Sequence, residues 1–268
     1  MMNNKKILVL YVAHFINDFS LSQYYKLKNE LPDGYDIVWW LDDNCKDEKL
    51  DNIQFIEFPH HYISPKPLQN TPYFNPMKYM EPYFNNNDWF RKYDFYWIVE
   101  YDVYFYGNWS IFFNTVDKYD EDLVGSALTI YKDTQTPISF GDIKFDNFRY
   151  KIKSYISIYR ISNRAMKYIS NYSYIDLNNM NDIRNYLYEI YIPTMLYNNG
   201  YTLLSLNSEK FIKESGNYMY DYSNIDFVNH YDECGFIDNA VETFWWNAKF
   251  NNINEMNIPN KLYTRYKQ

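Results

Sequence analysis

The sequence predicts one α/β domain built on an open, mostly parallel central sheet with helices on its faces. Three observations support this fold class. A chain of 268 residues fits one large domain. Its 47% hydrophobic and 22% charged residues are a balance that can bury a core. Short apolar runs also alternate with an amphipathic segment near the start, which is the pattern of right-handed βαβ units.

Three strands and one helix are expected first. Lys5 to Ala13 is a continuous apolar run of strand length, as in a central parallel strand. Residues 19–31 space their apolar side chains as an amphipathic helix does, and a Pro-Asp-Gly turn ends it. The buried strands Tyr35–Leu41 and Ile53–Phe58 follow.

The rest of the chain is less regular. Prolines predict a loop at 59–76, and a polar, irregular stretch is expected at 130–153. We expect helices at 77–84, 89–92, 109–118, 163–168 (capped by Ser162) and 181–199. Strands are expected at 97–103, 123–128, 156–161 and 201–206.

Charge, composition and missing motifs argue against several classes of protein. The net charge of −8, without a long basic run, disfavours a nucleic-acid binder. The 32 Tyr residues could line a carbohydrate site, but Tyr, Asn, Lys and Ile all have A/T-rich codons, which explains them more simply. The sequence lacks a P-loop, a G-x-G-x-x-G and a G-x-S-x-G, which argues against kinases, dinucleotide oxidoreductases and α/β-hydrolases.

The cysteines and the first residues bear on the compartment. Cys45 and Cys234 lack a metal-type spacing, so we expect free thiols in a reducing, cytoplasmic environment. The first apolar run is about eight residues long, too short for a membrane span, and no small-residue cleavage site follows it. We therefore expect neither a signal peptide nor a transmembrane segment there.

Two carboxylates end the most informative apolar run, WIVEYDV at residues 97–103. Alternate side chains of an extended chain share a face, so Glu100 and Asp102 can point the same way at the carboxyl end of a strand, where open α/β sheets bind ligands. Close carboxylates repel unless a cation lies between them. Mg²⁺ or Mn²⁺ takes few protein oxygens and completes its shell with phosphates. The pair predicts a metal that bridges a nucleotide diphosphate and stabilises the leaving group; the simpler interpretation is a strand end with two solvated acids.

The stretch NPMKYMEPYFNNNDWFRKYDFYWIVEYDVYFYGNWSIFF, residues 75–113, resembles GT-A glycosyltransferases and related bacterial and fungal domains. Their hallmark is an apolar strand, then D-x-D or E-x-D, then a small residue and an aromatic, here Gly107 and Trp109. The resemblance implies that Asp102 coordinates the metal and that Glu100 helps the metal or the ribose. Outside this block the match is looser but covers much of the chain.

The same resemblance implies a GT-A-like, Rossmann-like single domain over residues 1–268. Residues 1–128 would bind the nucleotide-sugar and residues 129–268 would face the acceptor. The implied enzyme uses Mn²⁺ or Mg²⁺ to move a sugar from a nucleotide-diphosphate donor to a glycan or lipid-linked hydroxyl, as in polysaccharide biosynthesis. Such an acceptor is compatible with peripheral membrane contact.

The resemblance also suggests a base. The family often has an acidic residue before a helix on the acceptor side, which makes Glu189 the candidate that removes the acceptor proton. Pro193 cannot donate to the carbonyl of Glu189, so a helix break is expected at that point. The simpler interpretation is a surface glutamate on an amphipathic helix.

One departure from the family concerns the metal. Related domains end in Leu-Tyr-His, whose histidine binds the metal, whereas this chain reads Leu262-Tyr263-Thr264-Arg265. His230 is a possible substitute, although a lone histidine is more often structural.

Nucleotide contacts are predicted from position. Loops after the first two strands commonly face the nucleotide in this fold, which selects His14 after the first strand and Asp42 and Asp43 after the second. Lys78 and Arg91 could pair with phosphate.

Two other functions remain open. A nucleotidyltransferase could use a similar sheet, but it usually needs a Gly-rich basic loop near the first strand, and residues 12–15 do not supply one. A non-catalytic sugar- or nucleotide-binding protein is slightly favoured by the missing late histidine.

Overall fold

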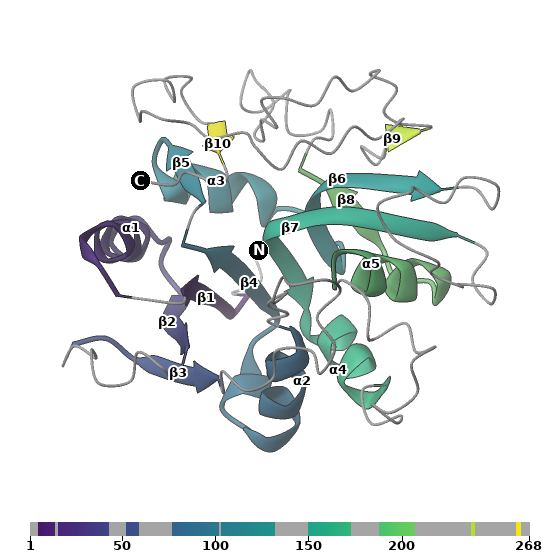
Figure 1. Cartoon of the computed structure of the whole chain (residues 1–268), viewed down its shortest axis with the longest axis horizontal. Coiled ribbons are helices and arrows are strands. Elements are labelled where there is room, and N and C mark those ends of the chain that lie inside the picture. Colours follow the sequence, from purple (N-terminus) through teal and green to yellow (C-terminus); the bar gives the residue numbers. More distant parts are fainter. Residues whose placement is uncertain are drawn as a thin grey trace, which may run out of the picture.

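An eight-stranded mixed sheet forms the centre of the chain (Figure 1). The computed structural model describes residues 5–13, 16–42, 52–58, 77–101, 103–131, 150–172, 188–206, 237–238 and 261–263. The strand order is β3-β2-β1-β4-β7-β6-β8, and β9 also pairs with β6. The strands are β1 (Ile7–Ala13), β2 (Tyr35–Asp42), β3 (Phe55–Phe58), β4 (Phe95–Glu100), β6 (Leu123–Tyr131), β7 (Lys151–Ser162), β8 (Leu203–Ser205) and β9 (Ile237–Asp238).

A two-stranded antiparallel sheet joins β5 (Tyr104–Tyr106) to β10 (Lys261–Tyr263). The helices are α1 (Asp18–Asn29), α2 (Met77–Asn86), the 3-10 helix η3 (Phe90–Lys92), α3 (Trp109–Val116), α4 (Asn163–Tyr172) and α5 (Tyr188–Asn198).

The order in which the chain forms its strands reverses between β1 and β4. β1 is parallel to both neighbours, β2 and β4. The chain leaves β1 through α1 to β2 and continues outward to β3, then crosses back through α2 to β4 on the other side of β1. Right-handed crossovers in opposite directions require helices on opposite faces. The junction of β1 and β4 is therefore the topological switch point of the sheet.

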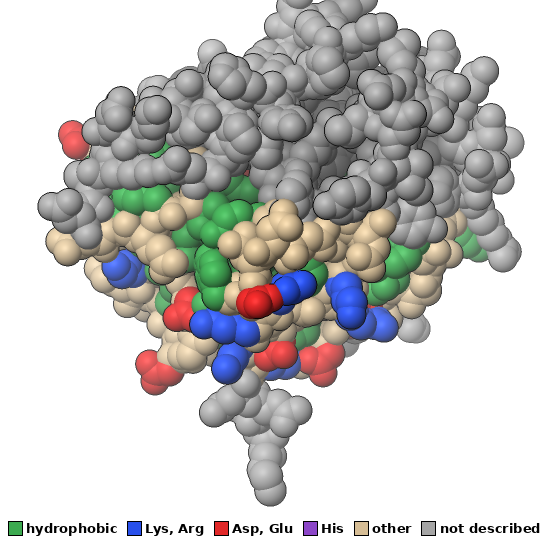
Figure 2. Space-filling model, turned by 90° about the horizontal axis from the view of Figure 1, so that it is seen from below, with side chains coloured by type: hydrophobic (Ala, Val, Ile, Leu, Met, Phe, Trp, Pro, Cys, Tyr) green, Lys and Arg blue, Asp and Glu red, His purple; other side chains and the backbone are tan. Residues whose placement is uncertain are grey.

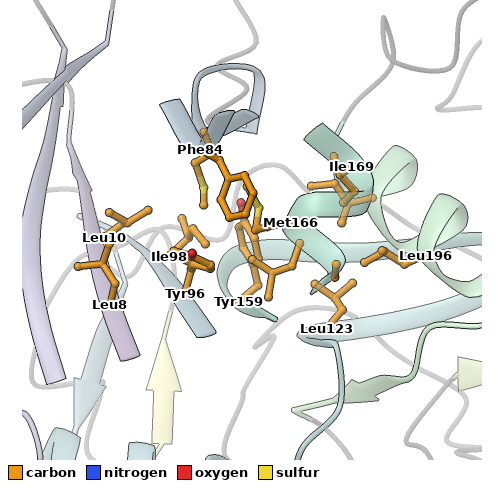
Figure 3. Packing of buried hydrophobic residues seen from close by; sticks show 14 of the residues in the cluster. Leu8, Leu10, Phe84, Tyr96, Ile98, Leu123, Tyr159, Met166, Ile169 and Leu196 are labelled. Atoms are coloured by element: carbon orange, nitrogen blue, oxygen red, sulfur yellow. The ribbon is translucent and has the colours of Figure 1, made fainter. Parts of the chain in front are cut away.

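Helices α2, α4 and α5 lie on one face of the sheet and α1 and α3 on the other (Figure 1), and an apolar cluster fills the space on each face. The first contains α2, α4 and α5 together with alternate strand residues such as Leu8, Leu10, Ile98 and Tyr159 (Figure 3). The second contains α1 and α3 with the intervening strand residues, among them Trp97. Every residue of β1 is buried because helices cover both faces of that strand.

The expected fold class is confirmed, with differences in individual elements. β7 begins at Lys151, whereas the sequence predicted irregular structure up to 153 and a strand only from 156. The short pair of β5 and β10 was not predicted either, because three-residue strands carry no clear periodicity. The predicted cap of α4 is present, since the Ala165 N–H donates to Ser162 Oγ at 3.2 Å.

Candidate functional site at the carboxyl end of strand β4

Glu100 ends β4 at the switch point of the sheet. It lies opposite Val12 of β1, and the next residue donates its N–H to the Val12 carbonyl at 2.9 Å. β1 ends one residue later, at Ala13, opposite Leu41 of β2. Three parallel strands therefore end together beside Glu100, which is half-buried. In open α/β sheets, ligands bind in the crevice outside such a set of strand ends.

The backbone turns directly after Glu100. The Val103 N–H donates to the Glu100 carbonyl at 3.0 Å, so the chain folds back instead of continuing the strand. The prediction that an extended chain places residues 100 and 102 on one face therefore does not describe this segment, because β4 ends before Asp102. Asp102 itself lies outside the described residues.

The late Leu-Tyr segment returns to this turn. In the antiparallel pair of β5 and β10, Tyr263 lies opposite Tyr104, four residues after Glu100. Thr264, which stands where related domains have histidine, follows Tyr263 directly in the sequence. Thr264 and His230 both lie outside the described residues. The topology thus brings a segment more than 150 residues away in sequence next to the Glu100 turn.

The predicted nucleotide contacts are placed only in part. Asp42 is the last residue of β2 and lies beside Phe58 of β3, at the same edge as Glu100. Lys78 is the second residue of α2. The structure describes only the backbone of these two residues, and His14 and Asp43 lie outside the described ranges.

The structure does not bring Arg91 to this edge, which corrects the prediction for that residue. Arg91 lies in η3, before β4, where Asp94 donates its N–H to the Lys6 carbonyl at the opposite end of β1. It forms a surface ion pair with Asp88. A strand of six residues spans roughly 20 Å, so Arg91 and Glu100 lie at opposite ends of the sheet although they are close in sequence.

Glu189 is the second residue of α5, which packs on the face of the sheet that also carries Glu100. The helix contributes Tyr191, Ile192 and Leu196 to the cluster that also holds Tyr96 and Ile98, and alternation along β4 puts Glu100 on that face. The predicted break is absent, since α5 continues from Tyr188 through Pro193. Pro193 removes a bond only to the first turn of the helix, where Glu189 lies half-buried.

Helix α5 is attached to the part of β7 that extends beyond β4. β7 pairs with β4 from Ile158 onward, so the first part of β7 runs on past the carboxyl end of β4. On that extension the Thr194 hydroxyl accepts from the Ile152 N–H and donates to the Ile152 carbonyl, both at 2.9 Å. The Asn198 side chain bonds both backbone groups of Tyr150. These bonds hold the helix of Glu189 on the carboxyl side of the sheet.

We predict that Thr194→Val destabilises the protein by about 2 kcal/mol, because it leaves two buried backbone groups of Ile152 without a side-chain partner. Urea unfolding at neutral pH measures the change. Thr194→Ser keeps the hydroxyl and should cost only about 1 kcal/mol for the lost methyl group. A valine variant as stable as the serine variant would contradict the prediction.

The described residues do not form a complete metal site by themselves. Among them, no three His, Cys, Asp or Glu side chains gather into a group that could hold a metal by itself. Mg²⁺ and Mn²⁺ take one or two protein carboxylates and otherwise phosphate or water oxygens, so Glu100 at the strand end could supply one of those ligands.

The described surface gives two further observations. On the described part of the face in Figure 2, Lys and Arg side chains are interspersed with Asp and Glu and form no patch of a single charge sign. None of the helices in the described ranges combines the length and the hydrophobicity needed to cross a membrane.

Comparison with known proteins gives weak structural similarities. No family model and no curated protein matches the sequence. The structure is similar to a protein described as a glucose-1-phosphate thymidylyltransferase from Bacillus anthracis, with 13% identity, a TM-score of 0.41, and coverage of 74% of this chain and 85% of that one. It is similar to the glycosyltransferase GlyE of Streptococcus pneumoniae TIGR4, with 13% identity, a TM-score of 0.38, and coverage of 75% and 45%.

A third similarity is to the bifunctional IspDF of Campylobacter jejuni, with 11% identity, a TM-score of 0.37, and coverage of 75% of this chain and 49% of that one. The chain thus spans about half the length of the second and third structures. The first two proteins are named as nucleotidyl- and glycosyltransferases. With TM-scores of 0.41 or lower, these similarities assign no activity to this chain, whose fold is the open, mostly parallel α/β sheet described above.

Proposed function

We propose that this chain is a metal-dependent glycosyltransferase that moves a sugar from a nucleotide-diphosphate donor to a hydroxyl of a glycan or lipid-linked acceptor. The observation that supports it best is the position of Glu100 at the switch point, where β1, β2 and β4 end together and the chain turns. Glu100 and Asp102 would hold Mn²⁺ or Mg²⁺. The bound cation would neutralise charge on the diphosphate that leaves.

The chain's own residues would divide the remaining work. His14, Asp42 and Asp43 would contact the nucleotide from the loops after β1 and β2, and Lys78 would pair with phosphate. Glu189 would take the proton from the acceptor hydroxyl. The acceptor oxygen would then bond to the sugar carbon while the bond from that carbon to the diphosphate breaks. The place of Glu189 on α5, on the same face and side of the sheet as Glu100, supports this role.

We predict that UDP or GDP with Mn²⁺ raises the melting temperature by roughly 5 °C, the shift for a ligand near one hundred times its Kd. Glu100→Gln and Asp102→Asn should each lose the Mn²⁺-dependent part of this rise in melting temperature, because each substitution removes a negatively charged ligand. Asp88→Asn, at the opposite end of β4 and 92% exposed, is the matched control and should keep the full shift. No shift of the parent protein with any nucleoside diphosphate would overturn the proposal.

A turnover assay separates the three functions considered from the sequence. A glycosyltransferase releases nucleoside diphosphate from a UDP- or GDP-sugar panel, and Asp102→Asn abolishes that release. Pyrophosphate release from a nucleoside triphosphate and a sugar 1-phosphate would instead show a nucleotidyltransferase. Nucleotide binding without either product would show a non-catalytic protein.

A further inference from the structure

Ser157 on β7 is a buried polar residue that the arguments above leave unexplained. Ser157 is only 3% exposed, and its hydroxyl has no hydrogen-bond partner in the structure. Buried hydroxyls in folded proteins are almost always hydrogen-bonded, and an unpartnered one needs an explanation. Ser154, three residues earlier on the same strand, shows the normal situation, since its hydroxyl donates to the Ser126 carbonyl at 2.9 Å.

The register of β4 and β7 ends one residue short of Glu100 and Ser157. Ile98 lies opposite Tyr159, and Val99 lies opposite Ile158, which is the last pair. Continued by one residue, the same antiparallel register would set Glu100 opposite Ser157. Residues directly opposite on antiparallel strands have Cβ atoms about 5 Å apart.

The same register would also set both side chains on one face of the sheet. Ile98 and Tyr159 belong to the same apolar cluster, and they appear close together in Figure 3. Glu100 and Ser157 are each two residues further toward the carboxyl edge, so alternation along β4 and β7 extends these two rows to them. On its other side β7 shifts register against β6 between Tyr155 and Arg160. Ser157 is thus the position of β7 that follows the last residue paired with β4, on the side of Glu100.

We propose that Ser157 is a positioning residue of the cation site: its hydroxyl donates to the Glu100 carboxylate when that carboxylate coordinates a divalent cation. This proposal depends on the cation site of the proposed function. A carboxylate can bind a metal through one oxygen and accept a hydrogen bond on the other, and such bonds orient metal ligands. Rotation about χ1 can turn a serine hydroxyl toward a carboxylate on the neighbouring strand. The hydroxyl would then gain on cation binding the partner that it lacks in the structure.

Ser157→Ala tests this proposal by two measurements, the affinity for Mn²⁺ and the melting temperature without metal. A positioning residue changes the first and not the second, whereas a structural residue lowers the second. Binding of Mn²⁺ alone, followed by loss of the free-ion EPR signal, should weaken about 10-fold, as for other groups that orient metal ligands. The melting temperature without metal should stay the same or rise, because the variant removes an unpartnered buried hydroxyl. Ser157→Thr keeps the hydroxyl and should retain Mn²⁺ affinity close to that of the parent.

Ser154→Ala is the matched control on the same strand. It removes a hydroxyl that has a partner, so it should lower the metal-free melting temperature and leave Mn²⁺ affinity unchanged. Parent-like Mn²⁺ affinity in Ser157→Ala, while Asp102→Asn loses binding, would overturn the role of Ser157 and leave the cation site standing. Parent-like affinity in Asp102→Asn and Glu100→Gln as well would overturn the cation site itself. A drop in the metal-free melting temperature of Ser157→Ala as large as that of Ser154→Ala would also overturn the proposal.

Discussion

Asp117→Asn is expected to destabilise the protein by about 4 kcal/mol, which lowers the melting temperature by roughly 10 °C. Asp117 follows α3 and accepts hydrogen bonds from three side chains that belong to three different strands. The Arg160 guanidinium donates to it at 2.5 Å, the Trp97 indole N–H at 3.2 Å, and the Tyr35 hydroxyl donates as well.

The size of this effect follows from the burial of Arg160. Its side chain is 0% exposed, and that of Asp117 is 8% exposed. Removal of one partner of a buried ion pair leaves the other charge uncompensated, which is far more costly than loss of a surface pair. The asparagine NH2 group would also face the Arg160 guanidinium and the Trp97 indole N–H, which can only donate. Burial, and then the nearby Asp117 carboxylate, raise the pKa of Tyr35 well above its ordinary range, so the tyrosine stays a donor at neutral pH.

Asp120→Asn is the matched control for Asp117→Asn. Asp120 pairs with Lys5 at 2.6 Å, but its side chain is 81% exposed. Exposed pairs contribute little, so this variant should stay within about 1 kcal/mol of the parent in urea unfolding. Equal losses in the two variants would show that Asp117 and Arg160 do not form the structural centre described here.

Asp122→Asn is expected to cost about 3 kcal/mol at pH 7, and the cost should shrink in acid. The Asp122 carboxylate accepts from Ser162 Oγ at 2.7 Å, Arg164 Nε at 2.6 Å and the Thr202 N–H at 3.0 Å. It thereby joins the starts of β6, α4 and β8. Asp122 itself is 1% exposed.

The pH dependence follows from the direction of the pKa shift. Burial raises the pKa of Asp122, but the hydrogen bonds from Arg164, Thr202 and Ser162 outweigh burial and hold it below the ordinary value of 3.8. A carboxyl group with a lowered folded-state pKa stabilises the protein above its unfolded-state pKa. That contribution is lost as the pH falls through the folded-state value.

Urea unfolding of the parent and Asp122→Asn at pH 7, 5 and 3.5 measures this change. The difference in unfolding free energy should be the same at pH 7 and 5 and smaller at pH 3.5. A difference that stays constant or grows in acid would contradict the argument. Asp88→Asn, which alters a carboxylate that is 92% exposed, should remain within about 0.5 kcal/mol of the parent at pH 7.

The sequence by itself determined the sheet on the amino-terminal side. β1, β2 and β4 are long apolar runs because both of their faces are buried, and such runs are recognisable without a structure. The turn sequence after residue 31 and the Ser162 cap were equally local, since each depends on residues a few positions apart. The placement of Glu100 at a strand end followed from the same local pattern.

Only the tertiary structure decided what lies beside Glu100 and what does not. Arg91 is near Glu100 in sequence but at the far end of the sheet, because a strand carries the chain across the whole molecule. Tyr263 and Ile158 are distant in sequence, yet strand pairing brings Tyr263 opposite Tyr104 and Ile158 opposite Val99, on either side of the Glu100 turn. Arg160 is completely buried because the segment after α3 supplies its hydrogen-bond partners and the Phe95 ring of β4 covers its guanidinium. Pairing register and burial are long-range properties, so no local pattern in this sequence specifies them.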